Sequence, residues 1–181
     1  MTGVQTCALP IYQIENAGAA IMALRHLGVG DAEAAVTRAD WPARMQRLRA
    51  GPLVESAPRV ELWLDGGHNP AGGMAIAATL ARMPARETHL ICGMLNTKDI
   101  AGYLRPLVAQ VAGLYSVSIP GEANTLPAEV TRDAALAAGM DAVVAGSVAD
   151  ALEAIAKHTP GARVLICGSL YLAGSVLREN G

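Results

Sequence analysis

Phenylalanine is absent from the sequence, and aromatic residues make up only 3% of its 181 residues. Hydrophobic residues nevertheless account for 52% of the chain, and much of this share is alanine, which lets helices pack closely. No run of about 18 uncharged apolar residues occurs, so a membrane-spanning helix is not expected. A chain of this length can form one α/β domain of about 100–150 residues plus an appendage, and can bury a core without disulfides.

An excess of basic charge is also lacking. Lysine and arginine number 14 against 16 aspartate and glutamate residues, which argues against nucleic acid as a partner. Only three cysteines occur: Cys92 and Cys167 lie in apolar, strand-like runs, and Cys7 stands alone. An odd number without paired spacing argues against a disulfide framework or a zinc site, so no metal ligands are predicted and a reducing cytoplasm is expected.

Several catalytic signatures are missing as well. The sequence has no G-x-x-x-x-G-K-[ST], no G-x-G-x-x-G after a strand, no H-E-x-x-H, no G-x-S-x-G and no C-x-x-C. This chain therefore carries no P-loop of its own. Its function has to be sought in other motifs.

The beginning of the chain divides into three parts. Residues 1–11 have no regular period and do not form a convincing signal peptide, so we expect a foreign leader there. Helical periodicity runs through residues 12–27, and Asp31 is placed to cap a second helix at residues 32–38. Trp41-Pro42 interrupts helicity, which predicts a linker over residues 41–50 before a domain at residues 51–181.

From residue 60 onward, short apolar segments alternate with helical segments. This alternation predicts an α/β, Rossmann-like fold with a mostly parallel sheet and helices on both faces. The predicted strands are 60–64, 88–93, 113–119, 142–145 and 163–168, and the predicted helices are 70–82, 98–111, 127–138, 148–157 and 171–177.

Polar and glycine-rich segments follow three of these strands, at residues 65–69, 93–99 and 168–171. Ligands of an open parallel sheet bind beyond the carboxyl ends of its strands. Glycine lets a ligand approach the backbone, and a helix N-terminus favours a carboxylate or phosphate. The most unusual segment is WLDGGHNPAGG at residues 63–73, where an acid and a histidine flank two glycines.

Structural alternatives exist for several of these residues. Asn69 could be a helix N-cap with Pro70 as the first helical residue, and Ser169 and Asp99 could also be only helix caps. Asp65 could cap a turn, and Arg44 could be a solvated surface charge. The residues alone leave these alternatives open.

Five segments taken together resemble a known family. They are QIENA at 13–17, WPARMQ at 41–46, LDGGHNP at 64–70, the pair Lys98-Asp99, and LICGSLYLAG at 165–174. In this order they are similar to the C-terminal part of the folylpolyglutamate synthase/dihydrofolate synthase family of the Mur ligase superfamily. The resemblance runs from Tyr12 to the end of the chain, with Ala43 standing where glycine is common.

The resemblance implies an ATP-dependent amide ligase that adds L-glutamate to dihydropteroate or to folates through an acyl phosphate. In that family a larger N-terminal ATPase domain carries the P-loop and the magnesium ligands. Residues 12–40 would then be a helical remnant of that domain, and the chain a fragment that is inactive without it. The resemblance further implies ATP with Mg²⁺ as cofactor, the ATPase domain as a partner in cis, and a cytoplasmic monomer.

The resemblance also implies roles for individual residues, although it gives no confident catalytic residue. Asn16, Arg44 and Asp65 would bind ATP, and His68 and Ser169 would bind glutamate. Other positions matching the motifs are expected to line the site: Gly66, Gly67, Asn69, Lys98 and Asp99.

Two other functions stay possible on the sequence. One is another Mur-type ligase that joins an amino acid to a cell-wall precursor. The other is a non-catalytic Rossmann-like module that binds a small acid or a nucleotide.

Overall fold

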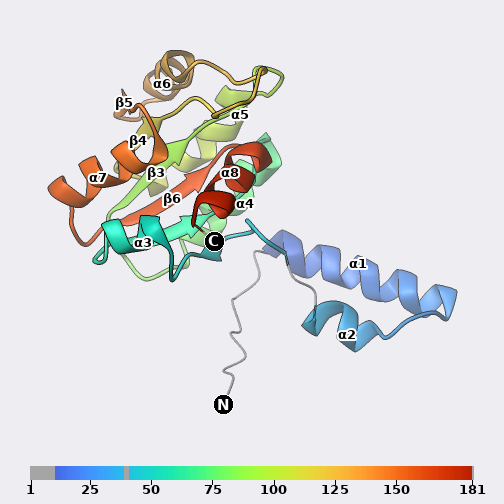
Figure 1. Ribbon diagram of the computed structural model, residues 1–181. Coiled ribbons are helices and arrows are strands. Elements are labelled where there is room, and N and C mark those ends of the chain that lie inside the picture. The colour runs from blue at the N-terminus through green and yellow to red at the C-terminus, as the bar shows by residue number, and fades with distance from the viewer. Residues whose placement is uncertain (1–10, 39–40, 181) are drawn as a thin grey trace. The chain divides into compact units, whose positions relative to one another are not determined.

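The computed structural model describes residues 11–38 and 41–180 (Figure 1). The predicted leader at residues 1–11 lies outside the described residues, apart from residue 11. The chain divides into two compact units, Met1–Pro42 and Ala43–Gly181, so the division falls inside the stretch predicted as a linker. Each unit is described separately below.

The first unit contains two helices, α1 at Ile11–Leu27 and α2 at Ala32–Thr37. The Asp31 side chain accepts hydrogen bonds from the backbone N–H groups of Glu33 and Ala34, as an N-cap does. Both helices begin and end within one residue of their predicted limits.

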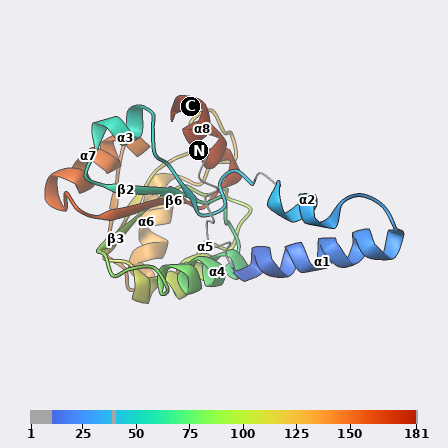
Figure 2. The ribbon, with the colours of Figure 1, turned by 90° about the horizontal axis from the view of Figure 1, so that it is seen from below.

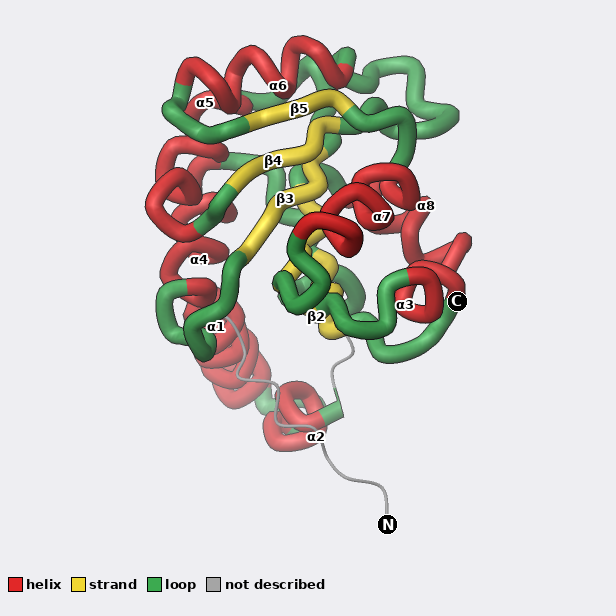
Figure 3. Tube along the Cα trace, turned by 90° about the vertical axis from the view of Figure 1, so that its left-hand side faces the viewer, coloured by secondary structure: helices red, strands yellow, loops and turns green. Residues whose placement is uncertain are grey.

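The second unit is built on a six-stranded sheet in the order β1-β2-β6-β3-β4-β5 (Figure 3). Only β1 is antiparallel, and it pairs with β2; the other neighbours are parallel. The mostly parallel α/β fold predicted from the sequence is confirmed. The strands are β1 Gln46–Arg47, β2 Glu61–Leu64, β3 Thr88–Cys92, β4 Gly113–Ser116, β5 Ala142–Val144 and β6 Arg163–Cys167.

Helices cover both faces of this sheet (Figure 2). One face packs against α3, α7 and α8, and the other against α4, α5, the 3₁₀ helix η1 and α6. No helix of residues 11–38 and 41–180 is long and apolar enough to cross a membrane. The helices are α3 Pro52–Ser56, α4 Pro70–Leu80, α5 Ile100–Leu104, η1 Arg105–Gln110, α6 Ala128–Ala137, α7 Val148–His158 and α8 Leu170–Asn180.

The central strand β6 shows why the apolar run at Arg163–Cys167 is not interrupted by exposed residues. All five of its residues are buried, because it lies between β2 and β3 with helices on both sides. Val164 and Ile166 pack towards α7 and α8, whereas Leu165 and Cys167 pack towards α4 and α5. Side chains that alternate along a strand in this way fill two separate cores.

Three local features differ from the prediction. Strand β1 and helix α3 were not predicted. The helix predicted at residues 98–111 is instead α5 followed by η1. Pro106 lies at the start of η1 and has no N–H to continue the α-helical hydrogen bonds, so the helix changes its winding there.

A charge network closes the amino end of the sheet. The Glu61 carboxylate lies 3.0 Å from Arg47, 3.2 Å from Arg86 and 3.4 Å from Arg163, and accepts a 2.7 Å hydrogen bond from Trp63 Nε1. Burial by itself raises the pKa of Glu61, but the Trp63 hydrogen bond and the three guanidinium charges outweigh it and lower the pKa. The charged form of Glu61 therefore stabilises the fold.

Acid should remove the stabilisation that the charged form of Glu61 contributes to the fold. Because the folded pKa of Glu61 is lowered, its stabilisation is fully present above the ordinary value of 4.5 and is lost as the pH falls through the folded pKa. We expect Glu61→Gln to lower the free energy of unfolding by about 2 kcal/mol at neutral pH, since it leaves the buried Arg163 without a charged partner. The free energies of unfolding of the two proteins, measured by urea titration, should converge as the pH falls below the folded pKa of Glu61.

Glu87→Gln is the matched control. Glu87 is exposed and its side chain pairs with His89 and Thr159, so its removal should change the stability by less than about 0.5 kcal/mol. A difference between Glu61→Gln and the unsubstituted protein that stays constant from neutral to acid pH would contradict the role given to Glu61.

Candidate ligand site at the carboxyl edge of the sheet

Asp65 follows β2 directly, and none of its surface is exposed. Its Oδ2 accepts a 2.8 Å hydrogen bond from the Met45 N–H, and its Oδ1 accepts one of 2.6 Å from the Gly67 N–H. One carboxylate therefore joins the turn before β1 to the loop after β2.

The turn held by Asp65 has an unusual backbone. Ala43 and Met45 adopt φ angles of +56° and +45°, a left-handed conformation that costs L-residues about 1–2 kcal/mol each. Two further hydrogen bonds fix it: the Gly66 N–H donates to the Ala43 carbonyl at 2.8 Å, and the Ala43 N–H donates to Gln46 Oε1 at 2.8 Å. Arg44 lies half-buried between the two left-handed residues. The conformation also explains why glycine suits position 43.

Asp65 is buried at an electrostatic cost. Burial raises the pKa of its carboxyl above the ordinary value, and the N–H groups of Gly67 and Met45 offset this only in part, together with the charge of Arg44. The carboxylate positions the turn that carries Arg44. Both carboxylate oxygens accept hydrogen bonds from backbone N–H groups in this structure. The contact of Asp65 with a nucleotide stays a prediction.

His68 lies at the end of the same loop and is half-buried. Its Nδ1 is 2.9 Å from the Gly66 carbonyl oxygen. A carbonyl can only accept, so we assign the proton of the neutral ring to Nδ1, which leaves Nε2 as a hydrogen-bond acceptor.

The two glycines of this loop leave room for neighbouring side chains. A Cβ atom at Gly67 would lie 2.9 Å from the Asp65 carboxylate and 3.1 Å from the Ile76 side chain. A Cβ at Gly66 would collide with the Leu170 side chain. Neither glycine is among the residues that line the pocket described below.

Asn69 and Asp99 act as helix caps. The Asn69 side chain accepts from the Gly72 N–H at 2.8 Å at the start of α4, where Pro70 is the first helical residue. The Asp99 side chain accepts from the Gly102 N–H at 2.9 Å at the start of α5. The capping alternative therefore accounts for both side chains, and neither lines the pocket.

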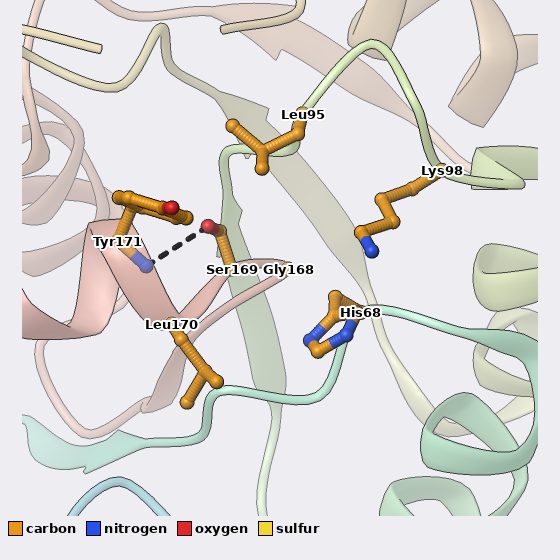
Figure 4. A pocket seen from close by; sticks show the side chains of 7 residues that line it. All are labelled: His68, Leu95, Lys98, Gly168, Ser169, Leu170 and Tyr171. Atoms are coloured by element: carbon orange, nitrogen blue, oxygen red, sulfur yellow. Dashed lines mark hydrogen bonds between the residues drawn. The ribbon is translucent and has the colours of Figure 1, made fainter. Parts of the chain in front are cut away.

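A pocket of about 230 Å³ opens where the loops after β2, β3 and β6 meet (Figure 4). His68 comes from the first loop, Lys98 from the second and Ser169 from the third. Among the described residues, its wall carries these three polar side chains, the Tyr171 phenol and no carboxylate, which suits an anionic ligand. The full lining is His68, Leu95, Lys98, Gly168, Ser169, Leu170 and Tyr171.

Ser169 caps α8 and faces the pocket at the same time. Its Oγ accepts a 3.0 Å hydrogen bond from the Tyr171 N–H, drawn as the dashed line in Figure 4. The hydroxyl proton is left to donate to a ligand. The Gly168 N–H donates to the Gly67 carbonyl at 3.2 Å and so ties the β6 loop to the β2 loop.

The structure thus brings together three of the predicted site residues, His68, Lys98 and Ser169. Arg44 lies on the turn before β1 and Asp65 lies directly after β2, and neither is in the pocket wall. Asn16 is exposed on α1, in the first unit. Leu95, Leu170 and Tyr171 were not among the predicted site residues, although each lies within a segment predicted to follow a strand, 93–99 or 168–171.

The family described as "Mur ligase, glutamate ligase domain" matches residues 43–170. The chain belongs to this ligase family. The match begins at the Asp65-bound turn and ends at the first residue of α8, so this ligase domain contains nearly all of the pocket.

Curated relatives are similar over most of this chain. A folylpolyglutamate synthase from Lacticaseibacillus casei is 31% identical over 140 residues, which are 75% of this chain and 29% of the relative. A dihydrofolate synthase/folylpolyglutamate synthase from Escherichia coli is 28% identical over 179 residues, 96% of this chain and 40% of the relative. The chain thus spans less than half the length of these relatives.

Solved structures agree with this relationship. E. coli FolC in complex with DHPP and ADP superposes with a TM-score of 0.72 at 27% identity, covering 90% of this chain and 38% of that one. Mycobacterium tuberculosis folylpolyglutamate synthase complexed with ADP and AMPPCP gives a TM-score of 0.64 at 26% identity, covering 82% and 35%.

Removing the Asp65 carboxylate should loosen the turn before β1. Asp65→Ala leaves the Met45 and Gly67 N–H groups without acceptors in a buried place, and we expect the free energy of unfolding to fall by about 2–4 kcal/mol. Urea unfolding followed by circular dichroism measures the change. Asp99→Ala serves as control, because the loss of an exposed cap costs only about 1 kcal/mol. Equal stability of the two variants would rule out the role assigned to Asp65.

Proposed function

We propose that this chain is the glutamate-binding part of an ATP-dependent amide ligase. The enzyme would join L-glutamate to dihydropteroate, to folates, or to both. Membership of the ligase family and the printed names of the two curated relatives support this proposal. The observation that carries it is the pocket wall of His68, Lys98 and Ser169.

The chemistry of glutamate fits this wall. L-Glutamate presents two carboxylates and one amine. The Lys98 ammonium and the Ser169 hydroxyl are donors suited to carboxylate oxygens. The Nε2 acceptor of His68 suits the amine, which must give up a proton in order to attack an activated carboxyl carbon.

Arg44 is the residue of the Asp65-bound turn that we assign to nucleotide phosphate. A planar guanidinium with several donors matches phosphate oxygens, and Asp65 would act by fixing the turn beneath it. ATP supplies the phosphoryl group that activates the acid. Asn16 is proposed to contact the adenine. Within the described residues no three His, Cys, Asp or Glu side chains are grouped to hold a metal ion. We propose that the ligands of Mg²⁺ come from the ATPase domain.

The domain organisation follows from the same proposal. Residues 12–40 would be the end of an ATPase domain that works in cis, residues 41–50 the linker and residues 51–181 the ligase domain. The division of the chain after Pro42 supports a boundary in this region. Two buried free thiols, Cys92 and Cys167, are compatible with the proposed cytoplasmic location, and we propose a monomer.

A hybrid enzyme tests the proposal. Residues 12–181 are joined to the ATPase domain of the E. coli relative, and ADP release is followed with glutamate and with the amino acids that other Mur-type ligases use. We expect release that depends on glutamate and on a pteroate or folate acid. A well-folded hybrid that prefers another amino acid, or that releases no ADP, would contradict the proposed function.

Substitutions in the pocket should separate binding from chemistry in that hybrid. Lys98→Gln and Ser169→Ala each remove a donor to carboxylate, so the KM for glutamate should rise about tenfold. His68→Gln keeps a hydrogen-bonding group but cannot take a proton, so kcat should fall about a hundredfold.

The matched control for these variants is Asp99→Asn. It lies beside Lys98 but points its side chain at its own helix, and both kinetic constants should stay within about twofold. Unchanged glutamate kinetics in all three pocket variants would remove this pocket from the glutamate site.

A further inference from the structure

A second pocket, of about 450 Å³, lies along α8 next to the first. The loop after β4 forms one wall, and α8 forms the other. Leu170 and Tyr171 line both pockets, so these two side chains form a ridge between them. The full lining is Ile119, Pro120, Gly121, Glu122, Leu170, Tyr171, Gly174 and Arg178.

Arg178 is the cation of this second pocket. It has no ion pair and no hydrogen bond to any residue in the described part of the chain. Its Nη1 lies over Gly174, 3.6 Å from the place where a Cβ would stand, so the absence of a side chain there leaves the guanidinium accessible. An exposed guanidinium next to a concave surface is a ready partner for an anion.

The carboxylate of the second pocket lies in the facing wall, on the loop after β4. Glu122 Oε1 accepts a 3.0 Å hydrogen bond from the Asn124 N–H within its own loop. Ile119, Leu170 and Tyr171 contribute apolar surface to the second pocket. The combination suits a carboxylate carried on a short methylene chain.

We propose that Arg178 binds a carboxylate of an acid substrate that already carries glutamate. This inference rests on the proposed function, in which the first pocket holds the incoming glutamate. The acid must reach that glutamate for the amide bond to form, so part of it has to lie beside the first pocket. The second pocket adjoins it across the Leu170–Tyr171 ridge, and every glutamate already added brings a free carboxylate for Arg178.

Nuclear magnetic resonance titration of the ¹⁵N-labelled 181-residue chain tests this inference. The two probes are L-glutamate and γ-L-glutamyl-L-glutamate. L-Glutamate should shift the amide signals of His68, Ser169 and Tyr171. The dipeptide should in addition shift those of Gly121, Glu122, Gly174 and Arg178, and this second set should weaken at high salt.

Arg178→Gln keeps the length and polarity of the side chain but removes its charge. It should weaken dipeptide binding at the second pocket about tenfold or more, while the glutamate shifts at the first pocket stay the same. Arg105→Gln is the matched control, because Arg105 is exposed on η1 on the opposite face of the sheet. It should behave like the unsubstituted chain.

The outcomes distinguish this inference from the proposed function. Glutamate shifts at the first pocket without dipeptide shifts at Gly121, Glu122, Gly174 and Arg178 would overturn the inference and leave the proposed function standing. Second-pocket shifts that survive Arg178→Gln unchanged would overturn the role of Arg178. Absence of second-pocket shifts at saturating dipeptide counts against the inference whatever happens at the first pocket.

Discussion

The carboxylate of Asp65 is the interaction on which the carboxyl edge of the sheet depends. It accepts from the Met45 N–H on one side and from the Gly67 N–H on the other, and no solvent reaches it. Two charge-assisted hydrogen bonds offset part of the cost of burying the charge, and they hold a turn with two left-handed residues that would otherwise relax. A single buried group thus positions both Arg44 and the loop that ends at His68.

The rest of the site is connected to the two hydrogen bonds of Asp65 by backbone contacts. The Gly168–Gly67 hydrogen bond links the loop after the central strand β6 to the loop after β2, so Ser169 and His68 share one rigid support. The opposite edge of the sheet carries the Glu61 network instead, where charges are paired with one another. Paired charges lie at one edge, and the donors that line the pocket lie at the other, as expected for a parallel sheet that binds ligands beyond its carboxyl ends.

The sequence predicts the five parallel strands because each is an apolar run between helical segments. The sequence does not predict β1, because two residues are too few to show the alternation of apolar and polar residues that marks a strand. It does not predict α3, because five residues form little more than one helical turn. The sequence does not decide whether Asn69 and Asp99 are helix caps or ligand-binding residues, and their hydrogen bonds to Gly72 and Gly102 identify them as caps. An acid in a polar cluster suggests exposure, so the burial of Asp65 was not foreseeable. Tyr171 and Leu95 line the pocket only because three loops distant in sequence converge.

Hydrogen exchange at the Met45 amide tests the central role of Asp65 most directly. Met45 lies in a turn outside any strand, where an amide normally exchanges quickly, but its N–H is bonded to a buried carboxylate. We expect it to exchange as slowly as the amides of β6, through global unfolding of the second unit. Exchange at the rate of an exposed loop, with β6 still protected, would contradict the account.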